Sequence, residues 1–318
     1  METTQKPLPH YKQDFLDWLD IEKGLSSKSQ QNYDRFLQRF FRWLQSNNLE
    51  NITPRELTQE FVWKYRVFLS RHESLKKSTQ NYYLIALRSL LTYFTEKDIT
   101  SLPAEKVKLA REKEERQVRF LNLDQLEKFF AAPDTSTFHG LRDRAILETF
   151  FSTGLRIIEL VSLNKEQIKI PQNASEELEE LEVTITGKGG RIRTVYFSQR
   201  TLDWLSRYFK IRTDNHDALF ITYASEKKKT NARRITPRTI QTMFKRATIK
   251  AGIPLNTTPH VMRHSFATDL LAQGVDIRTL QEFLGHKNIA ATQIYAHVTS
   301  KQLREIHQKF HSGKNLKI

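Results

Sequence analysis

The sequence predicts a mainly α-helical protein with a small antiparallel β-hairpin (α+β), built from an N-terminal four-helix domain and a C-terminal domain. Three observations predict this fold class. Apolar residues recur at helical spacing through most of the 318-residue chain. Only LEVTIT and RIRTVYF, on either side of GKGG, alternate apolar and polar residues as two paired strands do. A charged stretch at 99–118 separates the two helical parts.

The N-terminal part carries four helical patterns within a domain expected at residues 9–98, after a disordered N-terminus at 1–8. In the second pattern Tyr33, Phe36, Leu37, Phe40 and Leu44 recur at helical spacing and predict a buried face. The four helices are expected at about 11–21, 27–45, 54–70 and 78–97.

The C-terminal part is expected to form one domain at 119–311, after a linker at 99–118 and before a tail at 312–318. The hairpin lies inside it, with Lys188 at its tip, and a basic run at 225–234 is expected to be a flexible loop. Caps, glycines and prolines predict helices at about 121–131, 141–151, 201–212, 236–252, 259–273 and 276–285, and two more after residue 288.

Charge and composition narrow the class of protein. A net charge of +15 implies a polyanionic partner, with nucleic acid first. A basic membrane-binding protein is the alternative, but the basic residues are spread over many helices rather than gathered beside one amphipathic anchor. The absence of cysteine excludes a disulfide framework and a zinc finger, and no signal peptide or membrane span is predicted, so a cytoplasmic location is expected.

The residues from Thr257 to His297 bring four reactive side chains into three short predicted helices. His260 and Arg263 are three residues apart and share one helix face, His286 follows in a turn, and Tyr295 lies near the end of the third helix. A guanidinium can hold two phosphate oxygens, and a histidine can transfer protons near neutral pH. The set therefore suits attack of a tyrosine on a phosphodiester.

A metal site is the competing interpretation, because His260 and His264 are four residues apart on one helix. The residue after His260 is Val261, not the glutamate that the zinc-protease helix motif needs. No metal and no cofactor are therefore expected.

The pattern resembles the tyrosine recombinases, also called phage-type integrases, and most closely their Xer-type members. The segments that carry the resemblance are TGLRIIEL with Arg156, TGKGGR with Lys188, the His260–Arg263 pair, LGH with His286, and then Tyr295 nine residues later. The resemblance covers about residues 10–311. It implies an N-terminal core-binding domain and a C-terminal catalytic domain that close around DNA as a clamp.

The resemblance also implies the roles of these residues. Tyr295 would be the nucleophile that forms a 3′-phosphotyrosine, and Arg156 and Arg263 would stabilise the transition state. Lys188 would be the general acid, with His260 and His286 assisting. Glu159, three residues after Arg156, is expected to orient the Arg156 guanidinium.

The expected partner is double-stranded DNA with a specific recombination site. Basic residues of the helix at 236–252 are expected to contact it, namely Arg238, Lys245 and Arg246. The resemblance implies a homotetramer or heterotetramer joined through the C-terminal helix, in the nucleoid, and admits a DNA translocase as a further partner. Chromosome or plasmid dimer resolution is expected; a phage or transposon integrase, a type IB topoisomerase-like enzyme and a catalytically silent DNA-binding protein are the alternatives.

Overall fold

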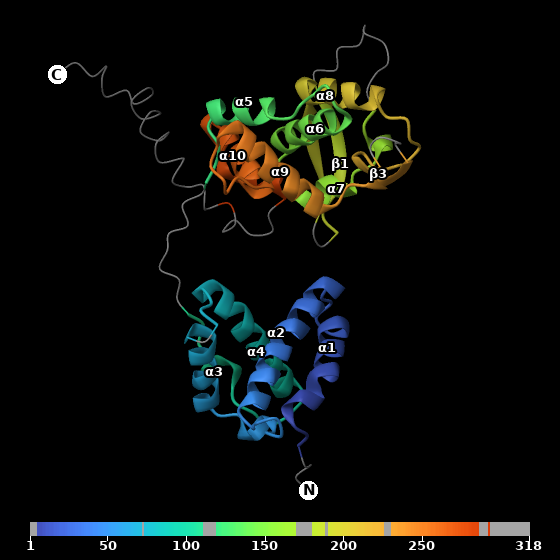
Figure 1. The fold of residues 1–318 in the computed structure, drawn as a ribbon. Coiled ribbons are helices and arrows are strands. Elements are labelled where there is room, and N and C mark those ends of the chain that lie inside the picture. The colour runs from blue at the N-terminus through green and yellow to red at the C-terminus, as the bar shows by residue number, and fades with distance from the viewer. Residues whose placement is uncertain are drawn as a thin grey trace, which may run out of the picture. The chain divides into compact units, whose positions relative to one another are not determined.

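The computed structural model describes residues 5–71, 73–110, 119–169, 180–187, 190–225, 230–285 and 292. The chain divides into two compact units, Met1–Glu115 and Arg116–Ile318. Each unit has its own apolar core. Helices dominate both, and the described strands all lie in the second unit (Figure 1), so the predicted fold class is confirmed.

The first unit is a bundle of four α-helices with short 3₁₀ turns. All four predicted helices are present because their apolar stripes pack on one aromatic-rich core, in which Phe40 and Tyr65 meet edge to face at 4.9 Å. The helices are α1 (Lys12–Ile21), α2 (Ser27–Ser46), α3 (Gln59–Arg71) and α4 (Lys77–Glu96), and the 3₁₀ turns are Leu8–Tyr11, Pro54–Glu56 and Ala104–Lys106.

Both predicted edges of this unit differ from the structure. Leu8, which was expected in a disordered N-terminus, is fully buried in the core. Ala104 and Val107, which were expected in a linker, are buried in the same core, and Leu109 packs against it. The charged composition of this stretch misled the prediction, because the few apolar residues among the charges are the ones that pack.

The second unit is organised around α6, which contacts α5, α8, α10 and strand β2 (Figure 1). Most of its buried apolar residues form one core, and a second, smaller cluster joins α10 to α11 through Phe266, Ala267, Leu271, Leu280 and Leu284. The helices are α5 (Leu123–Ala131), α6 (Phe138–Thr153), α7 (Ile157–Ser162), α8 (Gln199–Lys210), α9 (Pro237–Ala251), α10 (Pro259–Ala272) and α11 (Ile277–Leu284), with a 3₁₀ turn at Lys165–Gln167.

Two antiparallel strand pairs complete this unit. The predicted hairpin is present as β1 (Glu180–Thr186) and β2 (Ile192–Ser198), with Val183 opposite Val195. The second pair, β3 (Ile221–Ser225) and β4 (Thr230–Arg234), corrects the prediction of a flexible loop at 225–234. Its end is held because Arg234 donates hydrogen bonds to the backbone oxygen of Leu163 and to the side chain of Asn164.

Within the described residues, no helix combines the length and the apolar character that crossing a bilayer requires. Apart from Thr292, the helices predicted after residue 288 lie outside the described residues.

Candidate active site

The turn between α6 and α7 sets the position of Arg156. Gly154 ends α6 in the left-handed conformation, with φ of 58°. A Cβ atom at this position would lie 2.4 Å from Cδ1 of Phe266, so α10 can approach the turn only because the residue is glycine. Arg156 then occupies the N-cap of α7, and its guanidinium is about one-third exposed.

Glu159, in the first turn of α7, is buried with 5% exposure and accepts four hydrogen bonds. Arg156 donates its backbone N–H at 2.8 Å and Nη1 at 3.0 Å. Arg193 donates Nη1 at 3.0 Å and Nη2 at 2.7 Å. Burial alone would raise the pKa of Glu159, but the hydrogen bonds from Arg193 and Arg156 outweigh it and lower the pKa to about 2. Glu159 is therefore a carboxylate at any physiological pH.

Arg193 was not among the predicted site residues. It lies in β2, on the same face as the buried Val195 and Phe197. The sequence carried a signal for it, because strand alternation puts an arginine on the buried face of RIRTVYF. A buried charge requires a partner, and the partner is Glu159.

Helix α10 supplies the second arginine. Thr258 caps the helix and Pro259 is its first residue, as predicted. Arg263 is buried, and it donates Nη1 to the backbone oxygen of Gly154 at 2.6 Å and Nη2 to that of Leu284 at 2.5 Å. One guanidinium thus joins the ends of α6 and α11.

His260 is exposed at the start of α10, beside both arginines. Although the residue as a whole is exposed, the protein around its ring partly buries it and so lowers the pKa of His260, and the positive charges of Arg263 and Arg156 lower this pKa further. The pKa of His264 is lowered to about 4 by burial and by His260 and Arg263. These effects indicate that Arg156, His260 and Arg263, from two distant segments, share one electropositive region, which favours a bound anion.

The other predicted catalytic residues, Lys188, His286 and Tyr295, lie outside the described residues. The residues that directly precede Lys188 and His286 are described. Gly187 follows β1 at the hairpin tip, and Gly285 ends α11 in the left-handed conformation with φ of 60°. Both glycines lie close to Arg193. The residues that directly precede Lys188 and His286 are therefore beside Glu159 and its two arginine partners, Arg156 and Arg193, a group named here the Glu159 cluster.

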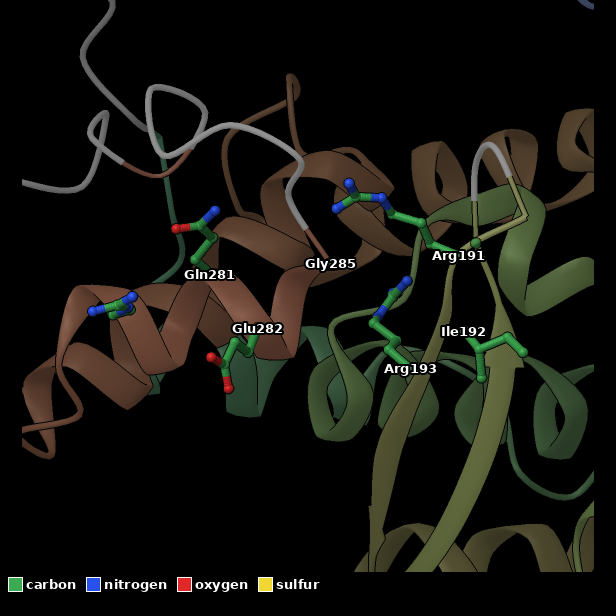
Figure 2. A pocket seen from close by; sticks show the side chains of 8 residues that line it. Arg191, Ile192, Arg193, Gln281, Glu282 and Gly285 are labelled. Atoms are coloured by element: carbon green, nitrogen blue, oxygen red, sulfur yellow. The ribbon is translucent and has the colours of Figure 1, made fainter.

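A hollow of about 450 Å³ lies between the hairpin and α11 (Figure 2). Arg191 and Arg193 line it from the hairpin, and Arg278 and Glu282 line it from α11. Among the described residues, no three His, Asp or Glu side chains are grouped so that they can hold a metal ion.

The predicted DNA-contacting residues lie on α9. Its inward face is buried through Ile240 and Phe244, while Arg238, Lys245 and Arg246 are all exposed. The helix therefore presents a basic outer face to solvent.

Two family models match most of the chain. The model described as "Phage integrase family" matches residues 119–302. The model described as "Phage integrase, N-terminal SAM-like domain" matches residues 13–98. The two matches fall in the two compact units.

Curated relatives and solved structures agree with this assignment. Tyrosine recombinase XerD of Lacticaseibacillus casei is 32% identical over 306 residues, which cover 94% of this chain and 97% of the relative. XerD of Vibrio vulnificus is 31% identical and covers 95% of each chain. The XerH recombinase bound to palindromic difH substrate has a TM-score of 0.73 at 19% identity, and the match covers 99% of both chains. A lambda integrase dimer bound to a COC' core site has a TM-score of 0.69 at 15% identity, and the match covers 92% of this chain and 77% of the integrase. The two solved structures show the shared fold, and the family models and XerD relatives show that the chain belongs to the phage integrase family of tyrosine-type, site-specific recombinases.

Proposed function

We propose that the chain cuts and rejoins DNA at a specific site through a 3′-phosphotyrosine on Tyr295. The observation that carries this proposal is the gathering of Arg156, His260 and Arg263 around one electropositive region of the family fold. Two arginines beside an exposed histidine suit a phosphodiester whose negative charge grows during attack.

The proposed reaction has two balanced steps. In the first, Oη of Tyr295 gives its proton to His260 and bonds to the scissile phosphorus, the bond from phosphorus to the 5′-oxygen breaks, and Lys188 gives that oxygen a proton. Arg156 and Arg263 hold the non-bridging oxygens, and His286 donates a further hydrogen bond. In the second step the 5′-hydroxyl of another strand attacks the phosphotyrosine and gives its proton to Lys188, while the leaving oxygen of Tyr295 takes back the proton from His260. The ester retains the bond energy, so the steps balance without ATP.

Double-stranded DNA is the proposed partner. The net charge of +15 and the exposed Arg238, Lys245 and Arg246 of α9 support it, because phosphate contacts supply most of the affinity of such proteins for DNA. The similarity to XerD proteins supports dimer resolution of chromosomes or plasmids in the nucleoid.

A tetramer on DNA, of this chain alone or with a second recombinase, is the proposed assembly, with a DNA translocase as a further partner. The apolar stripe of Leu303, Ile306 and Phe310 would dock on a neighbouring subunit. A largely apolar hollow of about 320 Å³, lined by Phe266 and Phe283, offers a surface of matching character on the second unit.

The test is covalent trapping on nicked duplex DNA that carries candidate sites from around the gene. The full-length protein is expected to form a denaturation-resistant adduct at a 3′-phosphate, in the presence of a chelator. Tyr295→Phe is expected to form none, because it lacks the nucleophilic oxygen. Tyr196→Phe removes a half-buried hydroxyl from β2 and serves as the matched control that keeps the adduct.

An adduct that survives in Tyr295→Phe would contradict the proposed nucleophile. Loss of the wild-type adduct on adding a chelator would contradict the proposed metal-free reaction.

A further inference from the structure

Arg193 holds both oxygens of the buried Glu159 carboxylate. Its Nη1 donates to Oε1 at 3.0 Å and its Nη2 to Oε2 at 2.7 Å, and its own side chain is only 10% exposed. A bidentate fork fixes the plane of a carboxylate as well as its charge. The orientation of Glu159 is therefore set from β2, which is not part of the motif that contains Arg156.

Oε1 of Glu159 is shared by the two arginines. Arg156 donates Nη1 to it at 3.0 Å, the same distance as Nη1 of Arg193. A buried carboxylate without a cationic partner favours its protonated form, which is a poorer acceptor. Because Arg193 keeps Glu159 ionised and fixed, it also sets where the side chain of Arg156, which is 30% exposed, lies.

Arg193 also packs against two glycines that precede predicted catalytic residues. A Cβ atom on Gly187 would lie 3.1 Å from Nη1 of Arg193, and one on Gly285 would lie 2.9 Å from its Cδ. Figure 2 shows Arg193 extending from the hairpin toward the end of α11, where Gly285 lies. Gly187 is followed by Lys188, and Gly285 by His286.

We propose that Arg193 is a positioning residue of the active site: it orients Arg156 through the Glu159 carboxylate, and its side chain fixes the backbone that leads into Lys188 and His286. The inference rests on the proposed function. One side chain thereby links the hairpin, the α7 start and the α11 end, three elements that lie between residues 157 and 284 of the chain.

The test measures the single-turnover rate of adduct formation on nicked site DNA, with the full-length protein at saturating DNA, between about pH 5.5 and pH 8.5, a range that spans the proton-transfer chemistry. Arg193→Met removes the fork and keeps most of the side-chain volume. Arg193→Lys keeps the charge without the fork. Arg200→Met removes the same charge from an arginine of α8 that donates to the other buried carboxylate, that of Glu148, and not to Glu159.

Arg193→Met is expected to react about 100-fold more slowly, the cost of a small misplacement of catalytic groups, while its DNA affinity stays near that of the wild type. Its rate should fall further toward acidic pH, because Glu159 loses the partner that keeps it ionised. Arg193→Lys should be intermediate and Arg200→Met close to wild type. The double variant Arg193→Met/Glu159→Gln should be no slower than the slower single variant, because both act through one carboxylate.

An Arg193→Met protein that reacts as fast as Arg200→Met would overturn the inference. So would a loss that is the same at every pH and multiplies with that of Glu159→Gln. If Arg193→Met does not fold, Arg193→Lys decides by the same two criteria. Failure of the wild type to form any adduct would instead contradict the proposed function.

Discussion

Two buried glutamates in the second unit, Glu148 and Glu159, are each held by two arginines, but the surroundings of those arginines differ. Glu148 of α6 is 3% exposed and accepts hydrogen bonds from Arg144 at 2.8 Å and Arg200 at 3.0 Å. Glu159 of α7 is 5% exposed and is held by Arg156 and Arg193. A carboxylate buried between two arginines is therefore not by itself a mark of an active site.

The arginines show the difference. Arg144 lies over the ring of Trp204 at 4.5 Å, and Arg200 lies over that of Phe130 at 5.1 Å, so both guanidiniums of the Glu148 cluster are stacked on aromatic rings. Arg156 is instead close enough to His260 to lower the pKa of its imidazole. We therefore predict that the Glu148 cluster serves packing, although the side chain of Arg200 is 56% exposed, and that the Glu159 cluster, beside His260, serves the proposed reaction.

The largest expected effect is on the rate of adduct formation, which should differ between Arg156→Ala in the Glu159 cluster and Arg200→Ala in the Glu148 cluster. Arg156→Ala should slow adduct formation by about 100- to 1,000-fold at saturating DNA, because it removes a donor to the charge that grows in the transition state. Arg200→Ala should cleave at nearly the wild-type rate and instead unfold at a lower temperature. Equal rates in the two variants, measured on one nicked substrate, would end the distinction between the clusters.

A smaller effect is expected on the unfolding free energy at acidic pH. Burial would raise the pKa of Glu159, but its arginine partners lower it from 4.5 to about 2, so the ionised form stabilises the fold fully above about pH 4.5. This stabilisation is lost as the pH falls from 4.5 toward 2. The difference in unfolding free energy between wild type and Glu159→Gln should therefore be about 2 kcal/mol smaller at about pH 3 than at about pH 6. Urea unfolding at both pH values measures it, and a difference that does not change with pH would show that Glu159 is not held as an ion.

The smallest expected effect is a shift in the pKa of His260. Burial, Arg263 and Arg156 lower the pKa of His260, so Arg156→Ala should raise it while Arg200→Ala leaves it unchanged. NMR titration of labelled histidine, with the His260 signal assigned from His260→Gln, measures the shift. An unchanged pKa in Arg156→Ala would place the guanidinium away from the imidazole.

Helices and the first hairpin could be predicted from the sequence because their signals are local. Caps such as Thr258 and Asp276 and stops such as Gly154 and Gly285 each act within a few residues. Strand β4 could not be predicted in this way, because Arg234 is held by residues about 70 positions earlier in the chain. The late start of the linker was missed for a similar reason: Val107 is buried only because another segment covers it.

In the candidate site, too, local contacts could be predicted from the sequence and contacts between distant segments could not. The contact between Arg156 and Glu159 was predicted, because residues three apart on a helix share a face. Arg193 was missed, because its partner lies 34 residues away in another element. The burial of Arg263 was missed as well, since the backbone oxygens that it contacts belong to the ends of two other helices.

The assignment of the Glu159 cluster to the active site is tested most directly by comparing Glu159→Gln with Glu148→Gln. Both changes remove the charge of a buried carboxylate held by two arginines, and the rate of adduct formation at saturating DNA and the unfolding temperature are measured for each. Glu159→Gln is expected to react about 10- to 100-fold more slowly, because Arg156 loses its fixed partner. Glu148→Gln is expected to react at the wild-type rate although its unfolding free energy falls by about 1.5 to 3 kcal/mol. Equal rates in the two variants, or a slower reaction in Glu148→Gln, would contradict the assignment of the Glu159 cluster to the active site.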